Sequence, residues 1–277
     1  MNGVEEALFG RIGTSSPASE NEYTGRDGLR YCRKCHEPTQ CRIVFMGRER
    51  IVPCLCTCGK EEVEREKRET AERDRLYEIA RMKAAGIQDR HLREWTFAKA
   101  EDTPVIRMAQ NYVKNWKRAK AENLGLLFWG DVGTGKSYAA ACIANALLEM
   151  RIPVLMTNFS KMLNQMGGLY SEERFSYISS LSGFSLLIID DLGIERSTDY
   201  AKEQVYSIID ERYKSGLPVI VTTNLTIEDL RCPMQLADAR IYSRILEMCT
   251  PVHVAGSDRR TAAGKSKQEI LKEVLFS

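Results

Sequence analysis

The sequence predicts an α/β protein whose main domain is a mostly parallel sheet with helices on both faces. In the last two thirds of the chain, short apolar runs alternate with longer helical patterns, and this alternation is typical of a parallel sheet. A cysteine-rich stretch and a stretch dense in charged residues come before these runs, which predicts a smaller module joined by a helix. The expected strands are residues 124–129, 154–157, 186–189, 218–222 and 251–254.

The composition suits one large domain and one small module. The chain has 277 residues, 43% of them hydrophobic, and a formal net charge of +2, so any contact with nucleic acid requires a local basic surface. No apolar run is long enough to cross a membrane and no secretion signal is visible, which together predict a cytoplasmic protein. We expect a flexible N-terminus at 1–28, a cysteine-rich zinc-binding module at 29–60, a charged linker helix at 61–85 and the main domain at 86–277.

Six of the nine cysteines lie between Cys32 and Cys58, and this crowding predicts a metal site. Clustered cysteines in a chain without a secretion signal bind metal more often than they form disulfides. Cys32 and Cys35 form a C-x-x-C pair, and a denser group follows a predicted β-hairpin at 41–51. Two such groups can surround one Zn²⁺ with four thiolates. The preferred ligands are Cys32, Cys35, Cys54 and Cys56, with Cys58 as an alternative to Cys54.

The cysteine cluster is also compatible with two alternatives to zinc. An iron–sulfur cluster would equally use four thiolates, and the cysteines could instead be ordinary buried side chains. His36 and Cys41 are weaker candidate ligands. Zinc would support a module that is too small to build a core of its own.

The stretch from residue 60 to residue 83 is dense in glutamate and arginine. It is expected to form a solvated helix held by ion pairs between residues four apart. Such a helix favours a linker or spacer role between the module and the main domain.

The strongest functional signal is G-x-x-x-x-G-K-S, a phosphate-binding loop, between a predicted strand at 124–129 and a predicted helix at 138–150. Its glycines let the backbone curl so that N–H groups point at phosphate oxygens, and the helix N-terminus adds a positive dipole end. Lys136 would reach the β- and γ-phosphates, and the Ser137 hydroxyl would bind Mg²⁺. The loop consists of Gly130, Asp131, Val132, Gly133, Thr134, Gly135, Lys136 and Ser137.

Two carboxylates and an amide stand where later strands are expected to end. Asp190 and Asp191 follow one apolar run, and Asn224 follows another. In parallel sheets the carboxyl ends of the strands form the ligand crevice. Asp190 would hold Mg²⁺, Asp191 would act as general base toward the attacking water, and Asn224 would orient that water. Taken alone, each residue could instead belong to an ordinary turn.

Four arginines follow Asn224 in the sequence. Arg240 and Arg244 are one helical turn apart, and Arg259 and Arg260 follow the last expected strand. Arginines can stabilise the transition-state charge of phosphoryl transfer, in their own chain or in a neighbour. Individually such residues are usually on the surface, and it is their place downstream of Asn224 that makes them candidates.

The stretch at 159–182 mixes basic and aromatic side chains. Such a mixture can contact single-stranded nucleic acid through phosphate charge and base stacking. The alternative is an amphipathic helix with its aromatic side chains in the core. The residues concerned are Lys161, Tyr170, Arg174, Phe175 and Tyr177.

The order of these motifs along the chain resembles that of the AAA+ family of P-loop ATPases. The phosphate loop comes first, then the strand with two aspartates, the strand with an asparagine, and the arginines. Residues 86–262 are more closely similar to replicative helicase loaders of the DnaC/DnaI type, to which the IstB transposition ATPases are related. The cysteine region and charged helix are also similar to the loader arrangement. The stretches that carry the resemblance are residues 130–137, 186–195, 222–225 and 240–244.

The resemblance implies hydrolysis of ATP with Mg²⁺ at an interface between subunits. Arg244 resembles the arginine finger, which acts on ATP bound to the adjacent subunit. Asp191 stands where many members have glutamate, and its shorter side chain implies slow, switch-like hydrolysis. The other correspondences are Lys136 and Ser137 with Walker A, Asp190 and Asp191 with Walker B, Asn224 with sensor I, and Arg259 or Arg260 with sensor II.

The first functional hypothesis is an ATP-dependent loader of a replicative hexameric DNA helicase, which assembles with itself through the ATP site. Its nucleotide state would switch its affinity for the helicase and for single-stranded DNA. The cysteine module favours this hypothesis, since in the loader family such a module contacts the helicase. The second hypothesis is an IstB-like helper of a DNA transposase. The third is a zinc-dependent nucleic-acid-binding regulator in which ATP is only structural.

Overall fold

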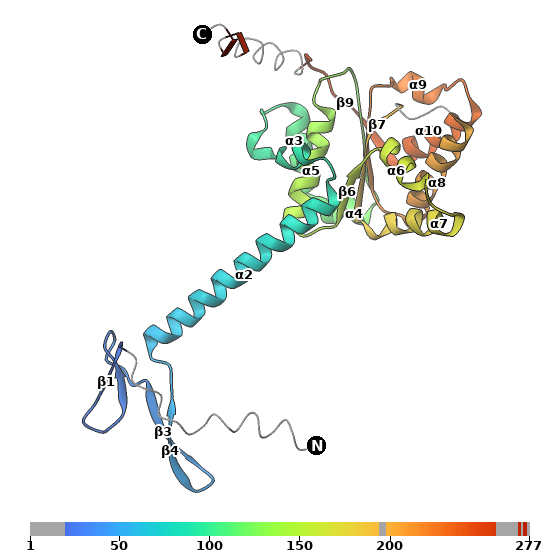
Figure 1. The fold of residues 1–277 in the computed structure, drawn as a ribbon. Coiled ribbons are helices and arrows are strands. Elements are labelled where there is room, and N and C mark those ends of the chain that lie inside the picture. The colour runs from blue at the N-terminus through green and yellow to red at the C-terminus, as the bar shows by residue number, and fades with distance from the viewer. Residues whose placement is uncertain (1–19, 194–197, 259–270, 273, 276–277) are drawn as a thin grey trace. The chain divides into compact units, whose positions relative to one another are not determined.

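The structure is a computed structural model, drawn in Figure 1. The chain forms two compact units, Met1–Leu76 and Tyr77–Ser277. The charged helix expected at 61–85 is α2, Thr57–Gly86, which begins in the first unit and ends in the second. The described residues are 20–193, 198–258, 271–272 and 274–275.

The first unit contains two small antiparallel sheets. Strands β1 (Glu22–Thr24) and β2 (Arg30–Cys32) form one sheet. Strands β3 (Gln40–Phe45) and β4 (Arg48–Pro53) form the other and are joined by a two-residue turn. The hairpin predicted at 41–51 is therefore confirmed.

Helix α2 has no broad apolar face within the first unit, and its glutamates and arginines pair along its surface. These pairs are exposed and lie three or four residues apart, so each contributes only a few tenths of a kcal/mol, roughly. They confirm the prediction of a solvated helix held by local ion pairs. The pairs are Arg65–Glu62, Arg65–Glu69, Arg68–Glu64 and Arg75–Glu72.

The second unit is built on a five-stranded parallel sheet in the order β6-β7-β8-β5-β9. This architecture confirms the predicted α/β class. Strand β6 has the bounds expected from the sequence, and the other four differ from expectation only at their ends. The strands are β5 (Gly125–Trp129), β6 (Val154–Thr157), β7 (Leu186–Leu192), β8 (Val219–Thr223) and β9 (Cys249–His253).

Helices and short 3₁₀ turns make the connections between these strands. No helix in the described part of the chain combines the length and the apolar character needed to cross a membrane. The α-helices are α3 (Pro104–Lys114), α4 (Trp116–Ala121), α5 (Lys136–Glu149), α6 (Phe159–Met166), α7 (Ser171–Ser180), α8 (Asp199–Ser215), α9 (Ile227–Arg231) and α10 (Leu236–Met248). The 3₁₀ turns are η1 (Arg90–Glu94), η2 (Phe97–Lys99) and η3 (Leu181–Gly183).

Successive residues of each strand face opposite layers of the unit. Phe128 and Ile188 lie in a core with α3, α4 and α5. Their neighbours Leu127 and Leu187 lie in a second core with α6, α8, α9 and α10. Figure 1 shows α3 and α5 on one side of the sheet and α8 and α10 on the other. Both faces are therefore covered, as parallel sheets require.

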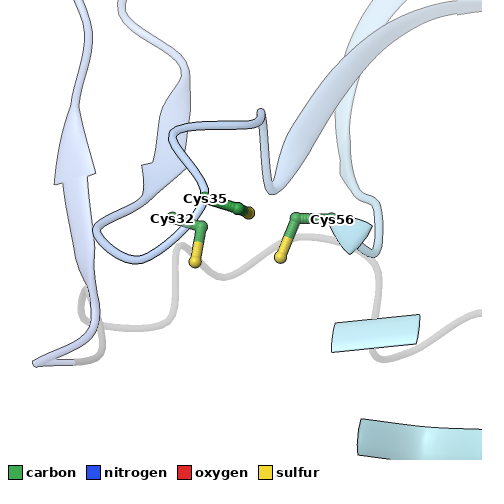
Figure 2. Close-up of side chains that lie close together, drawn as sticks. All are labelled: Cys32, Cys35 and Cys56. Carbon is green, nitrogen blue, oxygen red and sulfur yellow. The ribbon is translucent and has the colours of Figure 1, made fainter. Parts of the chain in front are cut away.

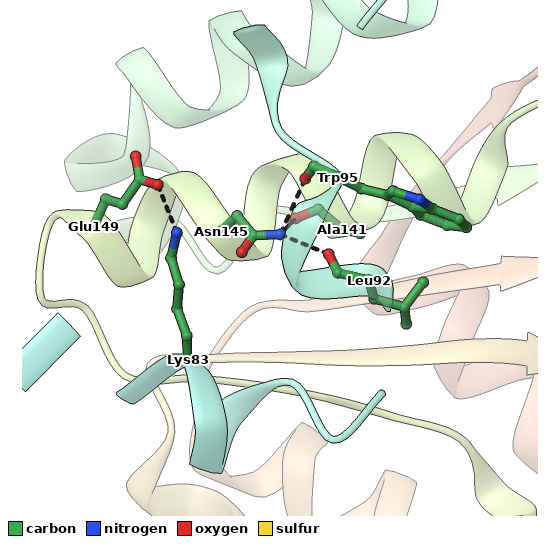
Figure 3. A network of polar contacts seen from close by, with 6 residues as sticks. All are labelled: Lys83, Leu92, Trp95, Ala141, Asn145 and Glu149. Atoms are coloured by element: carbon green, nitrogen blue, oxygen red, sulfur yellow. Dashed lines mark hydrogen bonds and ion pairs between the residues drawn. The ribbon is translucent and has the colours of Figure 1, made fainter. Parts of the chain in front are cut away.

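Helix α5, which follows the phosphate loop, is held against the segment that enters the second unit (Figure 3). The buried Asn145 donates from Nδ2 to the carbonyl oxygens of Leu92 at 2.8 Å and Trp95 at 3.0 Å. Lys83, near the end of α2, forms an ion pair of 2.6 Å with Glu149 at the end of α5. The buried bonds fix η1 and the following segment on α5, because breaking them would leave carbonyls unsatisfied.

Arg212, on α8, is a fully buried cation that the sequence did not single out. Its guanidinium donates to backbone carbonyl oxygens before β7 and β8, and burial lowers its pKa to about 10. It stays charged at neutral pH and satisfies carbonyls that water does not reach. These oxygens belong to Leu181, Phe184, Ser185 and Pro218.

Replacing Arg212 with alanine is expected to lower the free energy of unfolding by about 3–5 kcal/mol, because several buried carbonyls lose their donors. Urea denaturation measures the change. The control is Arg118→Ala, which removes an exposed pair with Glu122 and should cost less than about 1 kcal/mol. Equal losses of unfolding free energy in the two variants would contradict the stabilising role of Arg212 toward these buried carbonyls.

Candidate nucleotide site and metal centre

The predicted phosphate loop lies between β5 and α5, in the strand–loop–helix context that the motif requires. Gly130 and Gly133 have φ angles of 140° and 80°, in the region that side chains disfavour. A Cβ on Gly130 would lie 2.7 Å from the carbonyl oxygen of Val254, and one on Gly133 would collide with Asp258. These glycines are therefore required by the path of the loop.

Lys136 is buried within the loop that it closes, with 5% of its surface exposed. Its Nζ donates to the carbonyl oxygens of Gly130 at 2.8 Å and Asp131 at 2.6 Å. The Thr134 hydroxyl braces the same turn by donating to the Asp131 carbonyl at 2.9 Å. The ammonium is thereby placed at the loop, at the start of α5, where the helix N-terminus also favours an anion. Ser137 follows in the first turn and is half-buried.

Asp190 and Asp191 lie near the end of β7 and are tied to β8 through one buried hydroxyl. Thr222 donates from Oγ1 to Asp190 Oδ1 at 2.6 Å and accepts from the backbone N–H of Asp191 at 2.9 Å. The sequence places Thr222 in a predicted strand but does not indicate this role. Its signal is weak, since threonine is common in strands.

Asp191 has a φ angle of +58°, in a break of the β7–β8 register between Ile189 and Leu192. A non-glycine residue in this region costs about 1 kcal/mol and persists only where its surroundings hold it there. Here Thr222 holds the Asp191 backbone, and Thr223 donates from its hydroxyl to the Leu192 carbonyl at 2.8 Å. The strained backbone falls at the predicted general base, which is the pattern expected at a functional site.

The predicted site residues share one edge of the sheet. Trp129, the last residue before the loop, pairs with Thr223, and Leu192 pairs with the same threonine. Asn224 directly follows Thr223 and is exposed. Strand β5 continues into α5 on one face, whereas β7 and β8 continue into helices on the other. One edge of the sheet therefore carries the phosphate loop, the aspartates and Asn224. At this edge the chain leaves neighbouring strands toward opposite faces, and such a point is the ligand crevice of parallel sheets.

Arg244 lies apart from this edge in the structure, on α10 against α8. It forms an ion pair with Asp210, and its Nη2 donates to the Tyr206 hydroxyl at 3.0 Å. Its guanidinium also lies over the rings of Tyr206 and Tyr213, 5.1 and 4.9 Å from their centroids. Among the described residues, the partners of its ion pair, hydrogen bond and cation–π contacts all lie on α8. Arg240, one turn earlier, is exposed, and Arg240 and Arg244 both line a groove on the surface.

Arg259 and Arg260, the two candidates for sensor II, lie outside the described residues.

Three of the predicted metal ligands converge in the first unit (Figure 2). The Sγ atoms of Cys32, Cys35 and Cys56 all lie within 4.8 Å of one another. The backbone N–H groups of Lys34 and Gly59 donate to Cys32 and Cys56 Sγ, each at 3.4 Å. Among the described residues of this unit, only the side chains of Cys32 and Cys56 are buried. The chemistry fits a metal such as zinc, because thiolates at this spacing, with N–H donors, form its ligand sets.

Cys58, rather than Cys54, extends this cluster. A hydrogen bond from its thiol to Cys35 raises the pKa of Cys58 to about 11, and the bonds received by Cys35 lower its pKa to about 7. The Cys54 thiol instead donates to the Pro38 carbonyl at 3.4 Å and contacts Cys41. We therefore propose Cys58 as the fourth ligand, which is the alternative set named from the sequence and not the preferred one.

The aromatic residues around α7 are only partly in the core. Tyr170 and Phe175 are exposed, whereas Tyr177 is half-buried and donates to Gln165 Oε1 at 2.7 Å. Arg174 donates to the Tyr200 hydroxyl at 2.8 Å, beside a surface groove between α7 and α8. Core packing therefore does not account for Tyr170 and Phe175.

The family model described as IstB-like ATP binding protein matches residues 57–267. The chain belongs to this family. The match contains the phosphate loop, both aspartates and Asn224, so the sheet-edge residues identified above are part of the family region. The second unit is thus an ATP-binding AAA+ domain, and the resemblance described from the sequence is confirmed.

Curated relatives and solved structures agree with this assignment. The chain is 32% identical over 146 residues to the replicative helicase loader DnaC of Escherichia coli K12, covering 51% of this chain and 56% of that protein. It is 22% identical over 181 residues to the replicative helicase loader DnaI of Bacillus subtilis 168, covering 60% and 58%. The chain thus spans little more than half the length of the curated relatives it matches.

A crystal structure of DnaI matches with a TM-score of 0.52 at 22% identity, covering 65% of this chain and 99% of that one. A crystal structure of the DnaC helicase loader matches with a TM-score of 0.50 at 22% identity, covering 60% and 100%. At this level of identity the structural likeness shows the fold alone.

Proposed function

We propose that this chain is an ATP-dependent loader of a replicative DNA helicase. The observation that carries the proposal is the 32% identity to a protein named as a replicative helicase loader, joined to a sheet edge equipped for ATP. The cysteine cluster ahead of the ATPase region supports a dedicated docking part. Reduced thiols hold metal in a reducing compartment, so we place the protein in the cytoplasm.

The phosphate loop binds the ATP phosphates through its backbone N–H groups and the N-terminus of α5. Lys136, already at the loop, exchanges its contacts with the Gly130 and Asp131 carbonyls for β- and γ-phosphate oxygens. Ser137 and Asp190 would hold Mg²⁺, and the ion would supply positive charge that neutralises the phosphates. The hydrogen bond from Thr222 keeps the Asp190 carboxylate oriented toward this task.

Hydrolysis cleaves the bond between the γ-phosphorus and the bridging oxygen, as water adds to the phosphorus. Asp191 accepts the proton of the attacking water, and Asn224 orients that water from the neighbouring strand end. The strained Asp191 backbone, held by Thr222, restricts where its carboxylate can lie. The products are ADP and inorganic phosphate, and the change of nucleotide switches affinity for the partners.

Arg244 completes the site of a neighbouring subunit. In the single chain, Asp210 and two tyrosines hold its guanidinium beside the surface groove that Arg240 also borders. A preorganised arginine at a surface can stabilise the phosphoryl-transfer charge of ATP presented by another copy. Turnover then depends on assembly.

Single-stranded DNA binds along the exposed residues around α7. Tyr170 and Phe175 offer faces for base stacking, and Arg174 offers a charge for phosphate. DNA bound there contacts the AAA+ domain itself, and the nucleotide state of that domain changes its affinity for the DNA.

The test is a reconstitution with the replicative helicase of the source cell on circular single-stranded DNA covered by a single-strand-binding protein. Unwinding of an annealed oligonucleotide should rise at least about tenfold when the chain and ATP are both present, because loading limits the reaction. No stimulation, with no binding to the helicase, would contradict the loader function. Co-purification of a transposase from the source cell would instead favour the IstB-like helper.

A further inference from the structure

The chain that leaves β9 runs beside the phosphate loop. The backbone N–H of Val254 donates to the carbonyl oxygen of Trp129 at 2.8 Å, directly before the loop begins. Further along, a Cβ on Gly256 would lie 3.9 Å from the carbonyl oxygen of Thr134, which is ordinary van der Waals contact. Residues 254–258 therefore stay close to the loop after the strand has ended.

Asp258, in this segment, contacts the loop at Gly133. A Cβ built on Gly133 would lie 1.8 Å from Asp258 Oδ1 and 2.5 Å from Asp258 Cγ. The carboxylate therefore fills the space beside Gly133 into which a side chain would project. Asp258 is exposed, so burial does not hold it in this position. An anionic group thus rests on a loop whose chemistry is the binding of anions.

The features that bind phosphates also attract this carboxylate. Lys136 places its ammonium in the loop, and the N-terminus of α5 adds the positive end of a helix dipole. A carboxylate near a helix N-terminus is stabilised for the same electrostatic reason as a phosphate. This attraction favours the position of the exposed Asp258 side chain at the loop.

Bound phosphates and Asp258 would be two anions at one loop. The phosphate oxygens accept hydrogen bonds from the loop N–H groups, and the carboxylate lies against Gly133 of the same loop. Because the loop curls around the phosphates, the two anions are closer together than roughly 8 Å, the screening length at physiological ionic strength. Their repulsion disfavours ATP unless the carboxylate moves away.

We propose that Asp258 is an autoinhibitory anion of the nucleotide site, which phosphates must displace from the loop before ATP can bind. It weakens the binding of ATP, ADP and inorganic pyrophosphate alike, because it opposes the charge of the phosphates and does not act on the base. Arg259, a candidate for sensor II, is the next residue in the sequence. Because consecutive Cα atoms are held about 3.8 Å apart, displacement of Asp258 also moves this neighbour. The inference rests on the nucleotide-binding part of the proposed function and not on the helicase.

The experiment measures binding of ADP with Mg²⁺ to the full-length chain by isothermal titration calorimetry. Asp258→Asn keeps the size of the side chain and removes its charge, so it should tighten binding at least about threefold at low salt, about 0.05 M. The gain should fall below about 1.5-fold at about 1 M salt, where the screening length is roughly 3 Å. Inorganic pyrophosphate in place of ADP should show the same pattern, since it carries the phosphates without the base.

Two further variants test whether charge at this position is the cause. Asp258→Glu keeps the charge and should stay within about twofold of the unmodified chain. The matched control, Asp74→Asn, removes an exposed carboxylate from α2 in the first unit and should leave the Kd for ADP unchanged. A carboxylate that only braced the loop would give the opposite result, because its loss would weaken the binding of ADP.

The outcomes separate this proposal from the proposed function. Unchanged or weaker binding of ADP by Asp258→Asn would overturn the autoinhibitory role and leave the nucleotide site standing. A gain in affinity that persists at high salt, or that Asp258→Glu shares, would also overturn it, because charge would then not be the cause. If the unmodified chain binds no nucleotide, the proposed ATPase fails, and the autoinhibitory role fails with it.

Discussion

Replacing Lys136 with alanine is expected to reduce ATP turnover by at least about a hundredfold, the usual cost of removing one charged contact to a transferring phosphate. The physical reason is that the ammonium lies inside the phosphate loop, held by the Gly130 and Asp131 carbonyls. No other cation of the described loop can take its place. Release of phosphate from Mg·ATP measures turnover, and fluorescence of a labelled nucleotide measures binding.

Two further variants separate loss of binding from loss of catalysis. Asp191→Asn should keep nucleotide binding and lose turnover, because only the proton acceptor changes. Arg244→Ala should keep binding by each chain and lose the turnover that depends on assembly. If Lys136→Ala abolishes turnover while Arg244→Ala leaves it unchanged, the assembling ATPase is contradicted. That pattern would favour the zinc-dependent regulator in which ATP is only structural.

Removing metal with a strong chelator is expected to unfold the first unit while the second keeps its structure. Zinc binding contributes about 10–16 kcal/mol of apparent free energy in small zinc modules, and folding depends on it where no core exists. Here only Cys32 and Cys56 are buried among the described residues of the first unit, and both belong to the cluster. Hydrogen exchange should become fast in β1 to β4 and stay slow in β5 to β9.

A pair of matched variants tests which cysteine completes the metal site. Cys58→Ser should lower zinc affinity by at least about a hundredfold, as expected when one of four thiolates is lost. Cys54→Ser should keep one zinc per chain, since Cys54 contacts Cys41 and the Pro38 carbonyl instead. Zinc analysis after dialysis measures both. The reverse result would restore the ligand set preferred from the sequence.

Some of the site followed from local sequence, and other parts did not. The phosphate loop was predictable because its whole signal is local in the sequence. The glycines, the lysine and the flanking apolar runs all lie within a short stretch of the chain. The roles of Asp190 and Asn224 depended on strand order, which the α/β alternation indicates. Thr222 was missed, because its value depends on β7 and β8 being adjacent and on a break in their register.

The cysteine cluster, too, was only partly predictable from the sequence. The crowding of cysteines was enough to predict a metal site, but not to choose between Cys54 and Cys58. Our proposal of Cys58 rests on the hairpin, in which the Cys54 N–H donates to the Thr39 carbonyl at 2.8 Å and the Cys54 thiol lies beside Cys41. Cys54 and Cys58 are only a few residues apart in the sequence, but once the strands pair they lie beside different neighbours.

The sequence by itself determined the α/β class, the ATP-binding motif, the family and the presence of a cysteine site. Each of these depends on spacings of a few residues or on the order of elements along the chain. Only the tertiary structure decided that Arg244 pairs with Asp210, that Arg212 is buried, and that Phe175 faces solvent. Such contacts join residues that are distant in the chain, or depend on which face of an element is covered, and they exist only once packing has brought the elements together.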